Sequence, residues 1–253
     1  MAHKAASDVS GRTGGRSLRR VIASIPVIGP LLRRLYRRAV PVSPDLAFEQ
    51  STKYWNDRYS LGGNSGAGSY GRLAHFKADV LNEFVAEHGV RSVIEFGSGD
   101  GAQLELARYP QYTGIDVSQS AIDLCTRKFA RDRTKRFHHS SYLDSETIVA
   151  DLGMSLDVIY HLVEDEIFDV YMSRLVTSAE RYICIYSSNY YGVAPEPHIR
   201  HRCFTDWLAR RAPQWRLLRK IPNPYPADPA RPQDTSWADF YFFERDPQIS
   251  QLA

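Results

Sequence analysis

Acids and glycines in one short stretch form the most informative chemical pattern of the sequence. An apolar run over residues 93–96 contains Glu95 and leads into alternating glycines at Gly97, Gly99 and Gly101. Asp116 stands 19 positions after the first of these glycines, at the end of a second apolar run. Glycine lets a ligand approach the backbone closely because it has no Cβ. The pattern predicts a strand, a tight turn, a helix and a second strand that ends in a carboxylate, which together hold a nucleotide-like ligand.

Charge distinguishes two classes of nucleotide for this turn. The same residues fit a dinucleotide fingerprint that ends in Ala102 and uses Asp116 on the ribose. A pyrophosphate needs bare N–H groups and a helix dipole, whereas Glu95 and Asp100 flank this turn and would repel it. A sulfonium ligand that carries an ammonium group is cationic at that end, so the same acids would attract it. The sequence therefore favours S-adenosylmethionine (SAM) over NAD.

Three segments carry a resemblance to a known family. Residues 95–101, Glu-Phe-Gly-Ser-Gly-Asp-Gly, resemble the first motif of class I SAM-dependent methyltransferases, acid-x-Gly-x-Gly-x-Gly. Residues 114–118 resemble their second motif, and residues 151–161 resemble the motif of their fourth strand. The resemblance covers about residues 50–245 and includes bacterial methyltransferases that modify small molecules or glycans on oxygen. It implies SAM as the cofactor and S-adenosylhomocysteine (SAH) as the product.

The resemblance also implies where the cofactor binds, at the carboxyl ends of the strands of a doubly wound sheet. The glycine turn would line the methionine half, and Asp116 would accept hydrogen bonds from both ribose hydroxyls. Ser141 and Tyr142 fall where family members contact adenine. In an alternative interpretation Asp116 caps the next helix, although Ser118 suits that role better. The expected cofactor-binding residues are Tyr70, Glu95, Gly97, Ser98, Gly99, Gly101, Asp116, Val117, Ser141, Tyr142 and Ser155.

Asp157 and His161 are the expected catalytic residues, because they follow the fourth predicted strand, where the methyl group should point. Their spacing of four would place both on one face of a helix. Asp157 would then orient His161 as a general base near neutral pH. In the alternative, Asp157 caps the following helix and His161 binds the substrate passively. A metal shared by the two would lack a third ligand, so we expect none.

Two other segments are candidates for binding the methyl acceptor. One is an aromatic stretch at residues 54–59, and the other is a hydroxyl-rich and basic stretch at residues 187–202. Such side chains suit an acceptor with hydroxyls, and arginines suit a phosphate or carboxylate. An ordinary amphipathic helix and a solvated helix start are the alternatives. The expected acceptor-binding residues are Tyr54, Arg58, Tyr160, Asn189, His198, Arg200 and His201.

Strand and helix patterns alternate along most of the chain. Strands are predicted over residues 91–96, 112–116, 135–139, 151–156, 181–187, 215–221 and 239–244, and helices over 44–60, 70–88, 101–108, 118–130, 163–179 and 199–211. This alternation predicts an α/β fold, a three-layer αβα sandwich with a mostly parallel sheet. The resemblance implies seven strands with the last one antiparallel. Residues 45–88 would form a helical lid, following an N-terminal helical extension, and residues 89–253 the methyltransferase domain.

The charge of the chain is divided unevenly. Residues 1–44 hold nine Lys or Arg and one acid, while the rest holds 23 bases and 28 acids. We expect residues 1–44 to be a basic, partly disordered arm with a short amphipathic segment. It would pack on its own domain or on a partner in a homodimer. Alternatively, residues 19–40 would contact the anionic inner face of a membrane, or the arm would bind nucleic acid.

Composition narrows the choice of function. The mildly acidic body argues against a nucleic-acid substrate, and three dispersed cysteines indicate a reducing, cytoplasmic compartment, with the inner membrane surface as an alternative site. The leading hypothesis is a bacterial O-methyltransferase for a small molecule or saccharide, including a phosphorylated one. Alternatives are an RNA or protein methyltransferase tethered by the arm, a SAM-binding module without catalysis, and an NAD enzyme.

Overall fold

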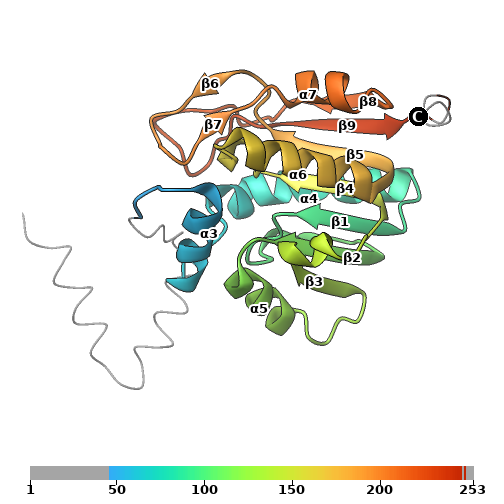
Figure 1. The fold of residues 1–253 in the computed structure, drawn as a ribbon, viewed down its shortest axis with the longest axis horizontal. Coiled ribbons are helices and arrows are strands. Elements are labelled where there is room, and N and C mark those ends of the chain that lie inside the picture. Colours follow the sequence, from blue (N-terminus) through green and yellow to red (C-terminus); the bar gives the residue numbers. More distant parts are fainter. Residues whose placement is uncertain (1–45, 247, 249–253) are drawn as a thin grey trace, which may run out of the picture. The chain divides into compact units, whose positions relative to one another are not determined.

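A seven-stranded sheet forms the centre of the protein (Figure 1). The computed structural model describes residues 46–246 and residue 248, so the predictions for residues 1–44 lie outside the described part. The strand order is β3-β2-β1-β4-β5-β9-β8. β1 to β5 pair in parallel, and β9 runs antiparallel to both of its neighbours. The predicted α/β sandwich with its last strand reversed is therefore confirmed.

Each predicted strand is present within two residues of its expected bounds. The strands of the main sheet are β1 (Ser92–Phe96), β2 (Gln111–Asp116), β3 (Lys135–His139), β4 (Ala150–Leu156), β5 (Ala179–Ser187), β8 (Trp215–Ile221) and β9 (Asp239–Arg245). Two short strands, β6 (Gly192–Val193) and β7 (Arg200–His201), pair with each other outside this sheet.

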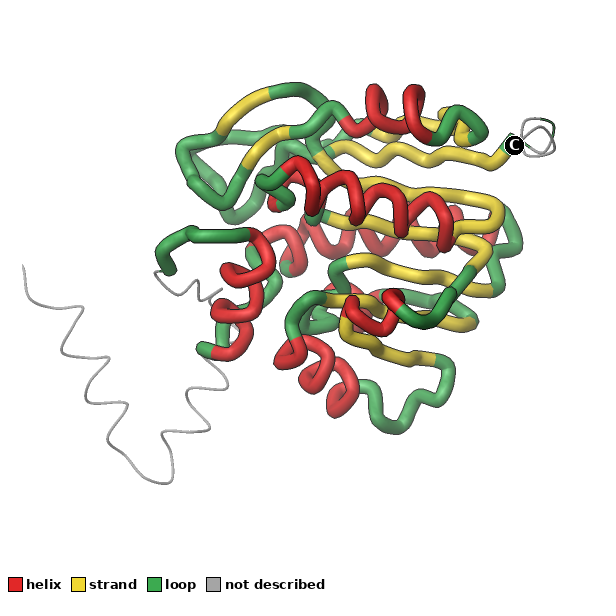
Figure 2. The backbone as a smooth tube through the Cα atoms, in the orientation of Figure 1, coloured by secondary structure: helices red, strands yellow, loops and turns green. Residues whose placement is uncertain are grey.

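Helices connect the strands and cover the sheet (Figure 2). The α-helices are α3 (Ser51–Ser60), α4 (Gly71–Glu87), α5 (Gln119–Lys128), α6 (Asp165–Ser178) and α7 (Phe204–Arg211). Short 3-10 helices occur at η1 (Ala67–Ser69), η2 (Gln103–Leu106), η3 (Ser140–Asp144) and η4 (Ile159–His161). Within residues 46–246, no helix combines the length and the apolar character that crossing a membrane requires.

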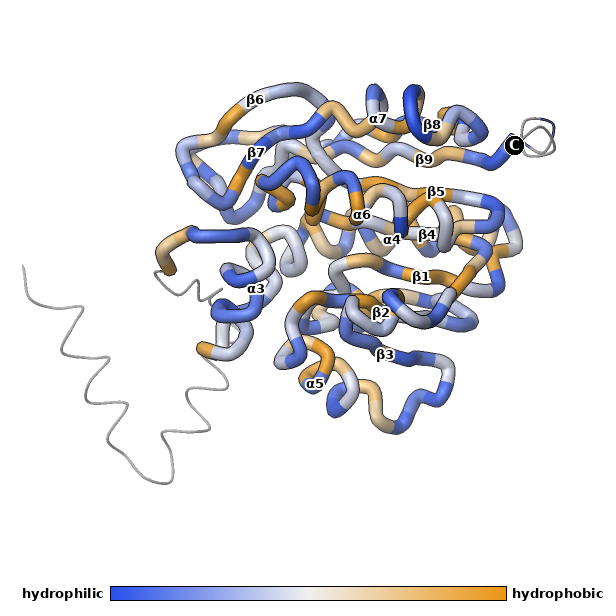
Figure 3. The backbone as a smooth tube through the Cα atoms, in the orientation of Figure 1, coloured by the Kyte–Doolittle hydropathy of each residue, from blue (hydrophilic) through white to orange (hydrophobic). Residues whose placement is uncertain are grey.

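Alternating side chains of β1 belong to two separate cores. Ile94 and Phe96 pack in the core that contains residues of α6, whereas Val93 packs in the core that contains residues of α4. Successive side chains of a strand point to opposite faces, so α4 and α6 cover opposite faces of the sheet. Figure 3 shows the central strands as mostly apolar, as expected for strands that are covered on both sides. Glu95, two residues after Val93, is therefore a buried acid on the α4 face.

Three predicted helices differ from the structure, and so does the expected helical spacing of Asp157 and His161. The helix expected over residues 44–60 begins only at Ser51. The helix expected over residues 199–211 begins only at Phe204, because β7 pairs with β6 before it. The helix expected over residues 101–108 is reduced to η2. After β4, Asp157 adopts a left-handed backbone with φ 59°, and only the short η4 follows. A right-handed α-helix cannot include a residue with this backbone conformation. The expectation that Asp157 and His161 share one face of a helix is therefore wrong.

Candidate active site

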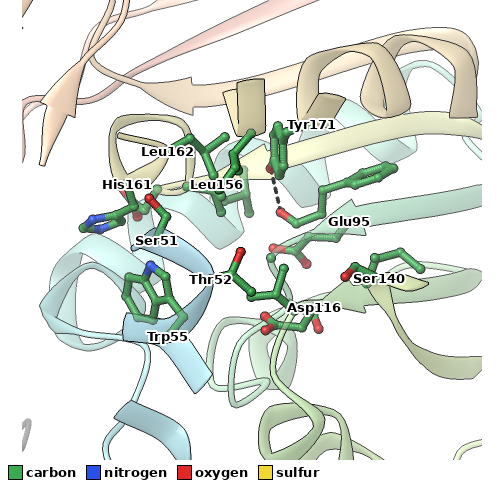
Figure 4. Close-up of a pocket in the computed structure, with 18 of the residues that line it drawn as sticks. Ser51, Thr52, Trp55, Glu95, Asp116, Ser140, Leu156, His161, Leu162 and Tyr171 are labelled. Atoms are coloured by element: carbon green, nitrogen blue, oxygen red, sulfur yellow. Dashed lines mark hydrogen bonds between the residues drawn. The ribbon is translucent and has the colours of Figure 1, made fainter. Parts of the chain in front are cut away.

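A cavity of about 390 Å³ lies at the carboxyl ends of β1, β2 and β4 (Figure 4). These strand ends contribute residues 95–98, 116–117 and 157–158, and α3 contributes Ser51, Thr52, Trp55 and Tyr59. In Figure 4, Asp116 and Ser140 lie toward one end of the cavity, and His161 and Trp55 toward the other. Open parallel sheets bind their ligands at this edge, and the volume is that of an ordinary small-molecule site.

Two positions in the turn after β1 require glycine. Gly97 and Gly99 have φ of 85° and 56°, in the region that favours glycine. A Cβ on Gly97 would lie 2.4 Å from Val158 Cγ2, and one on Gly99 would lie 2.2 Å from Ser65 Oγ. Gly101 packs behind the turn against Phe129. Of the predicted glycines, Gly97 thus lines the cavity, while Gly99 and Gly101 support it.

Asp116 is buried at the end of β2 and faces both the turn and the cavity. Its Oδ2 accepts the backbone N–H of Gly99 at 2.9 Å, and its Oδ1 accepts that of Ser118 at 2.9 Å. Burial raises the pKa of Asp116, opposed by these backbone hydrogen bonds. Each carboxylate oxygen can accept more than one hydrogen bond. Asp116 therefore fixes the turn and retains capacity for ligand hydroxyls, while Ser118 at the helix N-cap makes no side-chain capping bond.

Glu95 brings a second carboxyl group to the cavity from β1. The Tyr112 hydroxyl donates to its Oε2 at 2.6 Å. Burial raises the pKa of Glu95 to about 7, although the Tyr112 hydrogen bond and the charge of Lys77 both act to lower it. The acid is poised to ionise near neutral pH, and a cationic ligand would favour its ionised form.

Asp100 has a role different from the one expected, because it holds a loop instead of lining the cavity. This Ser65 loop, residues 61–70, follows α3. The Ser65 hydroxyl donates to Asp100 Oδ1 at 2.8 Å, and the Tyr70 hydroxyl donates to Oδ2 at 2.6 Å. The acids that line the cavity near the turn are therefore Glu95 and Asp116, and Tyr70 stabilises the loop from outside the cavity.

The remaining predicted cofactor residues lie in or next to the cavity. Val117 and Ser98 line it, and the Ser98 hydroxyl is buried without a hydrogen-bond partner among the described residues. Ser140 also lines it, whereas Ser141 and Tyr142 come just after and are exposed. Ser155 is buried in β4, with its Oγ 2.7 Å from the Tyr171 hydroxyl.

Two side chains hold Asp157, one from earlier in the sequence and one from later. Lys77, on α4, places its Nζ 2.6 Å from Asp157 Oδ2. The Tyr160 hydroxyl donates to Asp157 Oδ1 at 2.9 Å. Lys77 and Asp157 both line the cavity, whereas Tyr160 supports Asp157 from behind.

His161 lines the cavity but has no contact with Asp157 among the hydrogen bonds of the described residues. Its Nδ1 lies 3.1 Å from the backbone carbonyl of His198, so the Nδ1–H donates and Nε2 is left as an acceptor. The ring of Trp55 meets it edge-on at 4.9 Å. Desolvation lowers the pKa of His161 to about 3. The ring is therefore neutral near pH 7 and a weak base.

The predicted acceptor-binding residues are engaged in packing outside the cavity lining. Tyr54 stacks on His198 at 4.6 Å, and Arg58 donates to the carbonyl of Asn64 at 2.7 Å. Asn189 bonds to Thr205, and His201 to Ser188 at 2.8 Å.

Two arginines of the same stretch brace the chain after η4. Arg200 pairs with Asp165 at 3.0 Å and donates to the carbonyl of Val163. Arg202, which is buried, donates to the carbonyls of Leu162 and Val163 and pairs with Asp165. Both arginines therefore already have hydrogen-bond and ion-pair partners among the described residues of this chain.

Lys77 is the main site residue that sequence reasoning missed. Its side chain is 1% exposed, although lysine is rarely buried. A signal was present, because Lys77 occupies the apolar face of α4, four residues after Leu73 and four before Leu81. Tyr171, on the cavity wall with its hydroxyl 2.9 Å from the carbonyl of Phe96, carried no comparable signal.

Comparison with known proteins gives structural matches only. No family model matches the chain, and no curated protein matches it in sequence. Magnesium protoporphyrin IX methyltransferase from Synechocystis PCC 6803, crystallised with SAM, matches with a TM-score of 0.55 and 17% identity, over 80% of this chain and 100% of that one. N-methyltransferase NodS from Bradyrhizobium japonicum WM9, crystallised with SAH, matches with a TM-score of 0.57 and 13% identity, over 78% and 99%.

A third match is the methyltransferase domain of bacterial CtHen1-C, with a TM-score of 0.52 and 16% identity, over 67% of this chain and 96% of that one. The chain has the class I methyltransferase fold. At these identities the matches establish the fold, and function has to be argued from the site.

Proposed function

We propose that this protein is a SAM-dependent methyltransferase that acts on an oxygen atom of a small-molecule or saccharide acceptor. The observation that carries the proposal is the set of groups around the glycine turn. Asp116, Glu95 and Ser98 line one cavity next to Gly97. Methyltransferase neighbours crystallised with SAM or SAH support this choice of cofactor.

The residues present fit such a cofactor. Asp116 would accept hydrogen bonds from the ribose hydroxyls, and Glu95 would face the cationic methionine end. When bound, SAM supplies a methyl group on a sulfonium that is already a good leaving group. The protein has to align the acceptor and accept its proton.

An oxygen acceptor is supported by the half of the cavity near β4. Ser51, Thr52 and Trp55 from α3 line the cavity together with Asp157, so hydroxyls and an aromatic surface border the place where an acceptor would bind. The phosphorylated version of the acceptor has less support, because Arg200 and Arg202 already pair with Asp165. Cytoplasmic location, membrane contact through residues 19–40 and homodimer formation are further proposals.

Calorimetry with SAM and SAH tests the cofactor. We expect both to bind, and Asp116→Ala to weaken SAM binding at least about tenfold, as loss of hydrogen bonds to a charged group implies. Asp123→Ala, on the exposed side of α5, is the matched control and should bind normally. Equal affinities for the two variants would remove the ribose assignment. Tight NADH binding without any SAM binding would establish the NAD alternative.

Release of SAH tests catalysis across pools of phenols, sugars, RNA and peptides. We expect release with a hydroxyl-bearing small molecule or saccharide. Release with RNA or peptide instead would support the alternative of a tethered macromolecular methyltransferase. SAM binding without release in any pool would indicate a non-catalytic module.

A further inference from the structure

A buried ion pair joins α4 to the end of β4 inside the cavity. The Lys77 side chain is 1% exposed and that of Asp157 15% exposed, with 2.6 Å between Nζ and Oδ2. Asp157 is also the non-glycine residue with positive φ in the described chain. Strained backbone and buried charge at one position indicate a functional constraint.

Folding alone does not explain this pair. Removing two charges from water costs several kcal/mol per ion, and apolar residues of similar volume often serve stability as well or better. Apolar neighbours are available here, since α4 otherwise buries Leu73, Leu81 and Phe84 on the same face. The pair is therefore better explained by what it can bind.

Both members retain capacity for a further partner. An ammonium has three N–H donors, and among the described residues the hydrogen bonds of Lys77 use one, to Asp157. The Lys77 ammonium also lies 5.4 Å from the centre of the Tyr186 ring. Asp157 accepts from Lys77 and Tyr160, and a carboxylate has about four acceptor positions.

We propose that Lys77 and Asp157 together bind the acceptor hydroxyl, with Lys77 donating a hydrogen bond to its oxygen and Asp157 accepting its proton. This assignment rests on the proposed function and adds the catalytic groups for it. The oxygen–methyl bond forms as the sulfur–methyl bond breaks. The acceptor proton passes to the Asp157 carboxylate, and the sulfur of SAH keeps the electron pair. Tyr160 is a positioning residue, because its hydroxyl donates to Asp157 and its side chain lies outside the cavity lining.

His161 is less suited to the same task. Its Nδ1 is committed to the carbonyl of His198, and its neutral ring is a weak base. Asp157, by contrast, has Lys77 beside it as a donor that stabilises developing negative charge.

Three variants test the pair: Lys77→Met, Asp157→Asn and the double variant. Asparagine tolerates the left-handed backbone of residue 157, and Lys128→Met, whose lysine pairs with Glu105 outside the cavity, is the control. Urea unfolding, SAM calorimetry and SAH release with phenols and methyl glycosides are measured on each. The absorbance of 4-nitrophenol bound to the protein–SAH complex reports the ionisation of its hydroxyl, and this measurement needs no turnover.

We expect each single variant to lose stability, because it leaves one buried charge unpaired, and the double variant to regain it. Turnover should fall about 100-fold or more in all three. The wild type should shift ionisation of 4-nitrophenol to lower pH, and Lys77→Met should not. Recovery of turnover with stability in the double variant would overturn the proposal. So would a wild type that binds SAM yet shows neither turnover nor the ionisation shift, whereas loss of SAM binding in the wild type would refute the proposed function itself.

Discussion

The Ser65 hydroxyl donates a hydrogen bond of 2.8 Å to Asp100 Oδ1, and Asp100 returns one from its backbone N–H to Ser65 Oγ at 3.0 Å. This reciprocal pair fastens the Ser65 loop to the glycine turn. Tyr59 reinforces it, with its hydroxyl 3.0 Å from Ser65 Oγ. Because Ser65 and Tyr59 also line the cavity, the contact closes one side of the proposed cofactor site.

Ser65→Ala should therefore weaken SAM binding about tenfold, mainly by faster dissociation. Loss of a hydrogen bond to a charged group is worth about 1.5–3 kcal/mol. Stopped-flow fluorescence of the aromatic residues on α3 would measure the dissociation rate. Ser60→Ala, which removes a hydroxyl bonded only to the carbonyl of Asp57, is the control. An unchanged dissociation rate would show that the loop does not retain the ligand.

Glu95 should make the empty protein less stable as pH rises. Its folded pKa of about 7 lies above the ordinary 4.5, so the folded state holds a proton that the unfolded state has lost between those values. Its favourable contribution is complete below about pH 4.5 and is lost as pH rises through 7, by about 3 kcal/mol in total. The free energy of unfolding in urea is measured for the wild type and for Glu95→Gln across this pH range, and the difference between the two isolates the effect. A flat difference would refute the raised pKa.

SAM binding should show the opposite dependence on pH. A cationic ligand favours the ionised carboxylate, so affinity should rise as pH increases through about 7, with proton uptake by the buffer. Calorimetry in buffers of different ionisation enthalpy counts that proton. Tyr112→Phe removes a hydrogen bond that lowers the pKa of Glu95, so it should move the transition to higher pH. Glu95→Gln should abolish it.

His161→Gln and Asp157→Asn separate two assignments of the proton acceptor. If Asp157 accepts the proton, His161→Gln should keep most of the turnover, while Asp157→Asn loses about 100-fold. The sequence-based assignment of His161 as the base predicts the reverse order. Rates of SAH release at saturating SAM decide between them, with SAM affinity measured for both variants.

Arg202 and Arg200 should contribute unequally to stability. Arg202→Met leaves the carbonyl of Leu162 without its buried donor and removes one of two arginine donors to that of Val163, which should cost about 2–4 kcal/mol. Arg200, whose side chain is 40% exposed, forms a screened pair with Asp165, and Arg200→Met should cost about 1 kcal/mol or less. Urea unfolding compares the two. Equal losses would mean that burial does not set their importance.

Local patterns were enough to predict the sheet. Apolar runs predict β1 and β2, and the alternating glycines predict the turn after β1. Short segments of sequence therefore predict this edge of the cavity. Helix limits were harder where tertiary pairing overrides local preference. Arg200 and His201 pair with Val193 and Gly192 as strands, and α7 starts after them at Phe204.

The candidate site was predictable where its residues are close in sequence. Gly97 and Asp116 belong to one β-turn-β unit, whereas Lys77 reaches Asp157 across 80 positions. The spacing of Asp157 and His161 gave a helical prediction, because nothing in it reveals a left-handed residue at the end of β4. Charge alone also could not show that Asp100 faces the Ser65 loop.

One helix connects the two halves of the cavity. Tyr70, at the N-cap of α4, bonds to the glycine turn through Asp100, and Lys77, about two turns further along, bonds to Asp157. A ligand bound in either half would therefore restrict the motion of α4, which also holds the other half. Methyl donor and acceptor should thus each increase the affinity of the protein for the other. Thermodynamic reciprocity requires the two affinities to rise by one common factor. A factor of one for both affinities would mean that the two halves are not coupled through α4.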